Sequence, residues 1–211
     1  MSFSIHPEGW RFVAIFFFIS LICYWAAPGL GLVGFVLTAW CLYFFRSPRR
    51  ITPTRDDVIV SPADGIVCAI IDAVPPAEYD LGEEPRTRVS VFLNVFDVHV
   101  NRIPLAGTVS KYIYHPGKFF NASLDKASEH NERLTLVIHH AKITYAVIQI
   151  AGLIARRIRC DVKEGDVLTT GQLYGLIRFG SRVDVWLPQG AQLQVLKGQR
   201  MIAGETIIAT F

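Results

Sequence analysis

Charged residues are scarce in this sequence. They make up 18% of its 211 residues, whereas hydrophobic residues make up 51%. This balance is too apolar for an ordinary soluble domain, and the apolar excess is concentrated at the N-terminus. The net charge is only +3, which suits an anionic membrane surface but does not call for a nucleic-acid partner, and we expect none.

Cysteine and metal-ligand patterns are equally sparse. The chain has only four cysteines, Cys23, Cys41, Cys68 and Cys160. None has CxxC spacing, so we expect unpaired thiols in a reducing compartment. His139 and His140 have no third ligand at metal spacing, so we predict no metal site.

After Arg50 the chain lacks any long amphipathic helix. It consists of short β-rich runs separated by Gly, Pro, Asn and Asp, which predicts a mainly β domain over residues 51–211. The candidate strands are Val58–Val60, Ile66–Ile71, Val89–Leu93, Thr108–Tyr114, Leu134–His139, Thr144–Ile150, Gln172–Ile177, Val183–Leu187, Leu193–Leu196 and Thr206–Ala209.

The N-terminus has what the rest lacks, which is long apolar sequence. Residues 12–27 and 30–45 are almost wholly apolar, Pro28-Gly29 separates them, and a basic segment at 46–50 ends the second run. Each run is slightly shorter than the roughly 20 residues of a full helical span. A cleaved signal peptide would have one such run, and a buried hairpin of a soluble protein would have a polar face.

We therefore favour a membrane-associated helical hairpin over residues 1–50. Arg46, Arg49 and Arg50 follow the second run, and basic residues next to a membrane segment favour the cytoplasmic side. The expected location is the cytoplasmic face of the cell membrane.

Gly180-Ser181, between two predicted strands, is a candidate site of self-cleavage. Glycine tolerates a strained backbone and close approach to its carbonyl, and the Ser181 hydroxyl follows that carbonyl directly. Attack would shift the acyl group from nitrogen to oxygen, and β-elimination followed by loss of ammonia would leave a pyruvoyl group at position 181. Such a carbonyl forms a Schiff base with an amine and withdraws electrons. Taken alone, the Gly-Ser pair is typical of an ordinary turn.

Two further segments supply acid–base candidates. Ser61-Pro-Ala-Asp-Gly65 is either a common turn or a means of placing Asp64 beside a histidine, to orient and charge it. In Phe96-Asp-Val-His-Val-Asn-Arg-Ile-Pro104, His99 lies between Asp97 and Arg102 and is a candidate general acid or base.

A third segment offers possible anion ligands. His115 and Lys118 belong to the loop sequence His-Pro-Gly-Lys-Phe, and Asn131-Glu-Arg133 follows. The loop could hold a phosphate or be a solvated turn. We note also that Gly165–Gly171 and Gly198–Gly204 have the same spacing, as do paired Gly turns in the barrel-sandwich folds of biotinyl and lipoyl carrier domains, which is a likeness of fold only.

Taken in order, Ser-Pro-Ala-Asp-Gly, Phe-Asp-Val-His-Val-Asn-Arg-x-Pro, Asn-Glu-Arg and a late Phe-Gly-Ser resemble the short proenzymes of the phosphatidylserine decarboxylase family. The resemblance runs from about Ser61 to the C-terminus. It implies cleavage between Gly180 and Ser181, giving a β chain (1–180) and an α chain (181–211) that stay together as a heterodimer. It also implies a pyruvoyl cofactor derived from Ser181, and phosphatidylserine in the membrane as substrate.

The resemblance implies the site residues too. Ser181, His99 and Asp64 would be catalytic, and Arg102, His115 and Lys118 would bind substrate. Longer members have a second histidine where this chain has Arg102, so the base that activates Ser181 stays open. Arg102 cannot be a base near neutral pH, and we expect it to bind the lipid phosphate or carboxylate.

Two alternatives compete with a lipid decarboxylase. A membrane-anchored carrier or adaptor would present a lysine at a hairpin tip, but the segment between Gly171 and Gly198 contains only Lys197, which does not lie midway. A pyruvoyl enzyme acting on a soluble amino acid would not need the apolar N-terminus.

Overall fold

The computed structural model describes residues 3–117, 131–141, 143–152, 157–178 and 180–211. It divides into two compact units, Met1–Arg49 and Arg50–Phe211.

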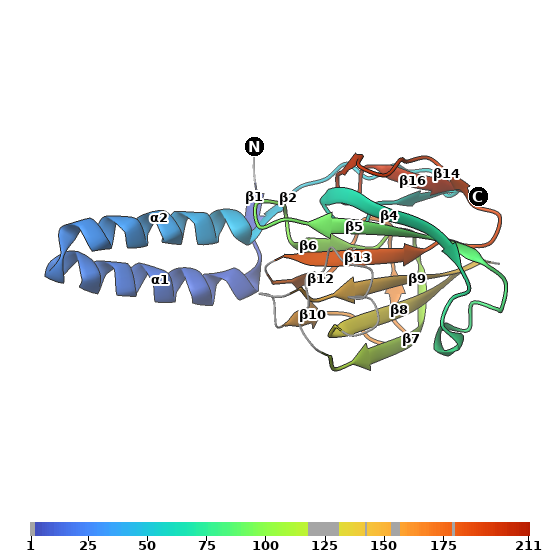
Figure 1. The fold of residues 1–211 in the computed structure, drawn as a ribbon, viewed down its shortest axis with the longest axis horizontal. Helices are drawn as coiled ribbons and strands as arrows, with labels where there is room; N and C mark the ends of the chain where they lie inside the picture. Colours follow the sequence, from blue (N-terminus) through green and yellow to red (C-terminus); the bar gives the residue numbers. More distant parts are fainter. Residues whose placement is uncertain (1–2, 118–130, 142, 153–156, 179) are drawn as a thin grey trace. The chain divides into compact units, whose positions relative to one another are not determined.

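The first unit is a pair of apolar helices, α1 (Pro7–Ala26) and α2 (Pro28–Phe44) (Figure 1). A short antiparallel pair, β1 (Phe3–Ile5) and β2 (Arg46–Pro48), joins the ends of the hairpin. The helices pack closely because glycines face the neighbouring helix. A Cβ on Gly34, for example, would lie 2.4 Å from the Oγ of Ser20.

The prediction of an N-terminal apolar helix pair is confirmed, but the first helix is longer than its apolar run. It begins at Pro7, and the Nδ1 atom of His6 accepts a hydrogen bond from the amide of Glu8 (3.3 Å). Proline suits the first helical turn, where its missing N–H costs nothing. The helix therefore reaches 20 residues, because it also includes the residues from Pro7 to Arg11 that precede the apolar run.

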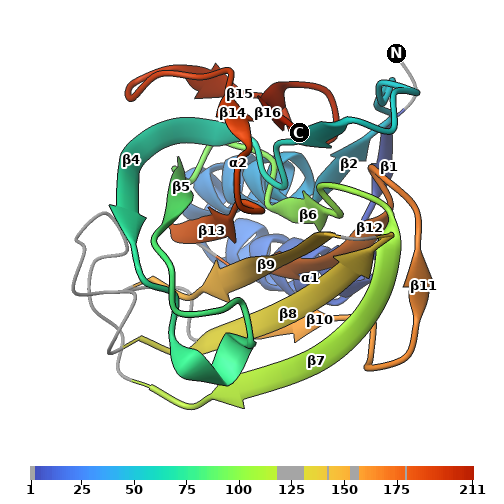
Figure 2. The same cartoon turned by 90° about the vertical axis from the view of Figure 1, so that its right-hand side faces the viewer.

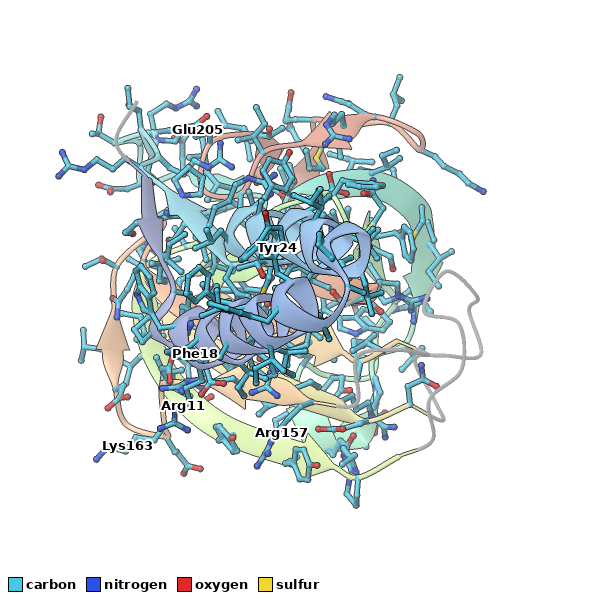
Figure 3. The ribbon with its side chains drawn as sticks, turned by 90° about the vertical axis from the view of Figure 1, so that its left-hand side faces the viewer. Arg11, Phe18, Tyr24, Arg157, Lys163 and Glu205 are labelled. Carbon is cyan, nitrogen blue, oxygen red and sulfur yellow. The ribbon has the colours of Figure 1, made fainter. Side chains whose placement is uncertain are left out.

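The outer surface of the hairpin is apolar. Phe18 is 60% exposed and Trp25 is 84% exposed, and Phe18 and Tyr24 are labelled in Figure 3. Among the described residues, α1 is the one helix of at least 18 residues that is long and apolar enough to cross a membrane. This composition is compatible with membrane association.

The second unit is built from short strands. They are β3 (Val58–Val60), β4 (Gly65–Ala73), β5 (Arg86–Leu93), β6 (Val100–Arg102), β7 (Gly107–His115), β8 (Arg133–His140), β9 (Ile143–Ile150), β10 (Ile158–Cys160), β11 (Val167–Leu168), β12 (Leu173–Ile177), β13 (Ser181–Trp186), β14 (Gln192–Leu193), β15 (Arg200–Met201) and β16 (Ile207–Thr210), with one 3-10 turn, η1 (Ala77–Tyr79).

Eight strands form one antiparallel sheet in the order β11-β7-β8-β9-β13-β5-β4-β15, which curls into a half-barrel (Figure 2). Two three-stranded sheets, β10-β12-β6 and β14-β16-β3, contribute to the same buried core. Alternate residues such as Val183 and Val185 point into this core, as the period of two in a strand requires. The prediction of a mainly β domain is confirmed.

Candidate active site

The predicted site segments meet where several strands of the eight-stranded sheet begin or end. A continuous row of strand partners runs across five strands, from Arg133 to Ile150, Arg182, Phe92 and Ile66. The Asn-Glu-Arg motif ends in this row, and Gly-Ser and Asp-Gly lie immediately beside it. Segments that are more than 100 residues apart in the chain are thus brought together by strand register.

The next row holds Ser181, the candidate nucleophile. Ser181 lies opposite Leu93 of β5, and the Phe-Asp-Val-His segment begins just beyond Leu93. Gly65 is one residue beyond the Ile66–Phe92 pair on the other side of β5. Since neighbouring strands lie about 4.8 Å apart, the backbones of Ser181 and Gly65 are separated by about 10 Å. Side chains from both strands can therefore enter one site.

Ser181 is fully buried and is the first residue of β13. By strand alternation it faces the interior with Val183, and its Oγ has no hydrogen-bond partner among the residues that the structure describes. Buried hydroxyls normally have partners. The preceding Gly180 has a φ of 62°, in the left-handed region that favours glycine.

His99 is also buried, at 1% exposure. Its Nδ1 lies 2.9 Å from the carbonyl oxygen of Asp97. A carbonyl can only accept, so this bond requires Nδ1–H, and in the neutral ring the lone pair is then on Nε2. The carbonyl of His99 accepts from the amide of Ile177 (3.3 Å), which ties the histidine to the strand that leads to Ser181.

The loop that holds His99 is fixed by the carboxylate of Asp97. One oxygen accepts from the amide of Asn94 (2.9 Å), and the other forms an ion pair with Arg200. Asp97 is 1% exposed. These bonds stabilise the conformation of the whole segment between Leu93 and His99.

The carboxylate of Asp64 contacts Arg50 and Ala203. Its Oδ2 lies 2.7 Å from Nη2 of Arg50, and its Oδ1 accepts from the amide of Ala203 at 2.8 Å. The role of Asp64 in orienting His99 stays a prediction. Arg50, which the sequence placed only in the basic segment after the second apolar run, is thus also paired with a candidate catalytic carboxylate.

Arg102 lies beside this ion pair. Its amide donates to the carbonyl of Pro62 (2.9 Å), and its guanidinium donates to the carbonyl of Gly171 (2.7 Å). Burial and, secondarily, the positive charge of Arg50 lower the pKa of Arg102, whereas Asp64 and Glu205 oppose that shift. Arg102 is therefore close enough to Asp64 for the two charges to interact. Binding of substrate by Arg102 stays a prediction.

The third predicted segment is only partly described. His115 lies at the end of β7, and its Nε2 is 3.0 and 3.1 Å from the two carboxylate oxygens of Glu78. Lys118 lies outside the described residues. Binding of substrate by these two side chains stays a prediction.

Comparison with known proteins identifies the chain. A family model for phosphatidylserine decarboxylase matches residues 37–209. The chain belongs to the phosphatidylserine decarboxylase family. It is 59% identical over 206 residues to the phosphatidylserine decarboxylase proenzyme of Cereibacter sphaeroides, covering 97% of this chain and 89% of that protein.

The resemblance read from the motifs is thereby confirmed. The chain is a carboxy-lyase of this family, which acts in phospholipid biosynthesis, and it is not a carrier or adaptor domain.

Sequence analysis missed one charged cluster in this decarboxylase. Arg182, directly after Ser181, is 1% exposed and forms two bonds with Asp184, of 2.7 and 2.8 Å. Arg88 of the adjacent strand lies 3.6 Å from the same carboxylate. The detectable signal was an Arg and an Asp at positions i and i+2 of an otherwise apolar strand, which places both on one face.

Proposed function

We propose that this decarboxylase matures by cutting its own chain between Gly180 and Ser181. The products would be 1–180 and 181–211, which remain together as a heterodimer, and Ser181 would become a pyruvoyl group. The mature enzyme would convert phosphatidylserine to phosphatidylethanolamine and carbon dioxide. The observation that carries this proposal is the buried hydroxyl of Ser181, which follows a glycine with positive φ and has no hydrogen-bond partner among the residues that the structure describes.

The cleavage can be written as a balanced sequence. The Oγ of Ser181 adds to the carbonyl carbon of Gly180 while a base takes its proton, and the amide nitrogen leaves protonated, giving an ester. Loss of the α-proton of residue 181 then breaks the Cβ–Oγ bond and releases the carboxylate of Gly180. Water replaces the nitrogen of the remaining dehydroalanine, and ammonia leaves.

His99 is the proposed base, since its Nε2 carries the lone pair when Nδ1 donates to the backbone carbonyl of Asp97. Asp64 would support it electrostatically. The second histidine of longer family members is replaced by Arg102, so His99 would serve both in maturation and in decarboxylation.

The residues present fit a pyruvoyl group at position 181, because the hydroxyl that must react is buried and has no competing partner among the described residues. When formed, that group supplies an electron sink for loss of carbon dioxide from an amino acid that is bound through its amine. His99 would donate the proton that replaces the carboxylate. Arg102, His115 and Lys118 would bind the anionic groups of the lipid.

The helix pair, residues 1–50, would hold the catalytic domain, residues 51–211, at the membrane. The apolar surface of α1 supports this assignment. Basic residues after α2 would lie on the cytoplasmic face. A lipid substrate would then reach the site without leaving the bilayer fully.

The test is Ser181→Ala, with Ser90→Ala as a matched control. Ser90 is equally buried but lies on β5 facing the other side of the sheet from Leu93. Intact mass spectrometry should find two chains and a pyruvoyl terminus in the wild type and in Ser90→Ala. Ser181→Ala should be a single chain that releases no carbon dioxide from phosphatidylserine. Two chains from Ser181→Ala would refute self-cleavage by this hydroxyl.

A further inference from the structure

A pair of buried amides lies in the core behind Ser181. Asn101 belongs to β6 and Gln149 to β9, and both have 0% exposure. The Nε2 of Gln149 donates to the Oδ1 of Asn101 over 2.8 Å. Gln149 is flanked two residues away on each side by the core residues Val147 and Ala151, so it points into the half-barrel.

This pair has unused hydrogen-bonding capacity. Within the described part of the chain, neither Nδ2 of Asn101 nor Oε1 of Gln149 has a partner. Turning over both amides together would exchange donor and acceptor in each residue, but one donor and one acceptor would still remain. Buried polar groups are nearly always paired, so an unpaired donor next to an unpaired acceptor indicates a missing ligand or water.

The pair lies next to the reactive residue. Gln149 is opposite Val183, which is two residues after Ser181 on the same face of β13. Such a diagonal across adjacent strands places Ser181 and Gln149 about 7–8 Å apart at their Cα atoms. Asn101 is two residues after His99. An amine that reaches residue 181 must enter this same interior, because Ser181 itself is fully buried.

We propose that Asn101 and Gln149 bind the amino-acid end of the lipid headgroup and select serine over ethanolamine. The leftover donor would bind the carboxylate, and the leftover acceptor would bind the hydrogen-bearing nitrogen. This rests on the proposed function. A neutral donor orients the carboxylate without the strong ground-state stabilisation that a cation would give, and such stabilisation would oppose the loss of carbon dioxide.

The decisive variant is Asn101→Asp. It keeps the size of the side chain and the oxygen that accepts from Gln149, and it changes only the leftover donor into an acceptor that repels a carboxylate. Gln149→Glu also removes the leftover donor, because the amide of Asn101 must then donate to the new carboxylate. Ser90→Ala is the control for removal of a buried polar group elsewhere in the sheet.

The assay separates recognition of the carboxylate from general damage. Full-length protein in detergent is first checked by mass for the two chains and the pyruvoyl terminus. It is then mixed with dihexanoyl phosphatidylserine or dihexanoyl phosphatidylethanolamine and cyanoborohydride, and the initial rate of covalent adduct formation on the 181–211 chain is measured. The two lipids differ only in the carboxylate.

We expect Asn101→Asp to lower the adduct rate with the serine lipid about 10- to 100-fold, the effect of one hydrogen bond to a charged group. The rate with the ethanolamine lipid should stay within about 3-fold, and Ser90→Ala should change neither. Equal losses with both lipids, or no loss with either, would overturn the proposal.

Failure of both Asn101→Asp and Gln149→Glu to mature would overturn it as well, in favour of a role in folding or cleavage. A wild-type protein that forms no pyruvoyl, or no adduct with either lipid, would instead refute the proposed function on which the inference rests.

Discussion

The backbone at Gly180 gives the sharpest test of the proposed cleavage. Its φ is 62°, and a Cβ added there would meet nothing within 4 Å. Gly180→Ala therefore introduces no clash and acts only through the left-handed conformation, which costs a residue with a Cβ about 1–2 kcal/mol. With no packing to hold it, the alanine would relax to negative φ and turn the carbonyl away from Ser181.

The expected effect on cleavage follows from that cost. A penalty of about 1–2 kcal/mol reduces the population of the productive conformation about 5- to 30-fold. Gly180→Asn should be slowed less than Gly180→Ala, because asparagine tolerates positive φ better. Cleavage can be timed during cell-free synthesis, by the conversion of one chain into two on a denaturing gel.

Gly190 provides the matched control. It lies beyond the other end of β13, has a φ of 77°, and also has nothing within 4 Å of an added Cβ. Gly190→Ala should thus lower the melting temperature as much as Gly180→Ala does, without slowing cleavage. The reasoning is refuted if Gly180→Ala matures at the wild-type rate, or if Gly190→Ala slows maturation equally.

The remaining predictions concern proton transfer, charge and anchoring. His99→Ala should slow decarboxylation about 10²-fold or more and should also slow cleavage. Asp64→Asn should slow cleavage and lower the melting temperature, because Arg50 loses its counter-charge. Arg102→Ala should cleave but turn over lipid poorly; if it fails to mature while His99→Ala is normal in both assays, the assigned roles are inverted. A chain beginning at Arg50, which keeps the ion pair with Asp64, should retain its β-rich circular dichroism but largely stop sedimenting with membranes, and full sedimentation would contradict anchoring by the hairpin.

The sequence predicted the motifs of the site better than the strands around them. Val100–Arg102 is a strand, yet its polar residues were assigned only to a catalytic segment, because three residues are too few to show an alternating pattern. The strand expected over Leu193–Leu196 is only Gln192–Leu193. Such short strands exist because their neighbours position them, and single-sequence patterns do not contain that information.

The sequence also did not reveal which polar side chains pair with each other in the fold. The bond between Arg50 and Asp64 joins two segments that each have a local explanation, a basic flank and a Pro-containing turn. Gln149 was detectable in principle, since it is the one strongly polar side chain in the apolar run from Tyr145 to Ile150. A polar residue on the buried face of a strand calls for a partner, but only the fold shows that the partner is Asn101.

The position of β13 determines when this protein can fold. The strand is hydrogen-bonded on one side to β5 and on the other to β9, so cleavage before Ser181 would leave the small chain clamped in the middle of the sheet. That piece also carries β14, β15 and β16, and strands with so little sequence around them cannot form a stable structure alone. Correct assembly is then possible only while the polypeptide is continuous. Once cut, the enzyme would keep its fold but could not refold after denaturation. A chain that misfolds before cleavage would, for its part, never acquire the pyruvoyl group.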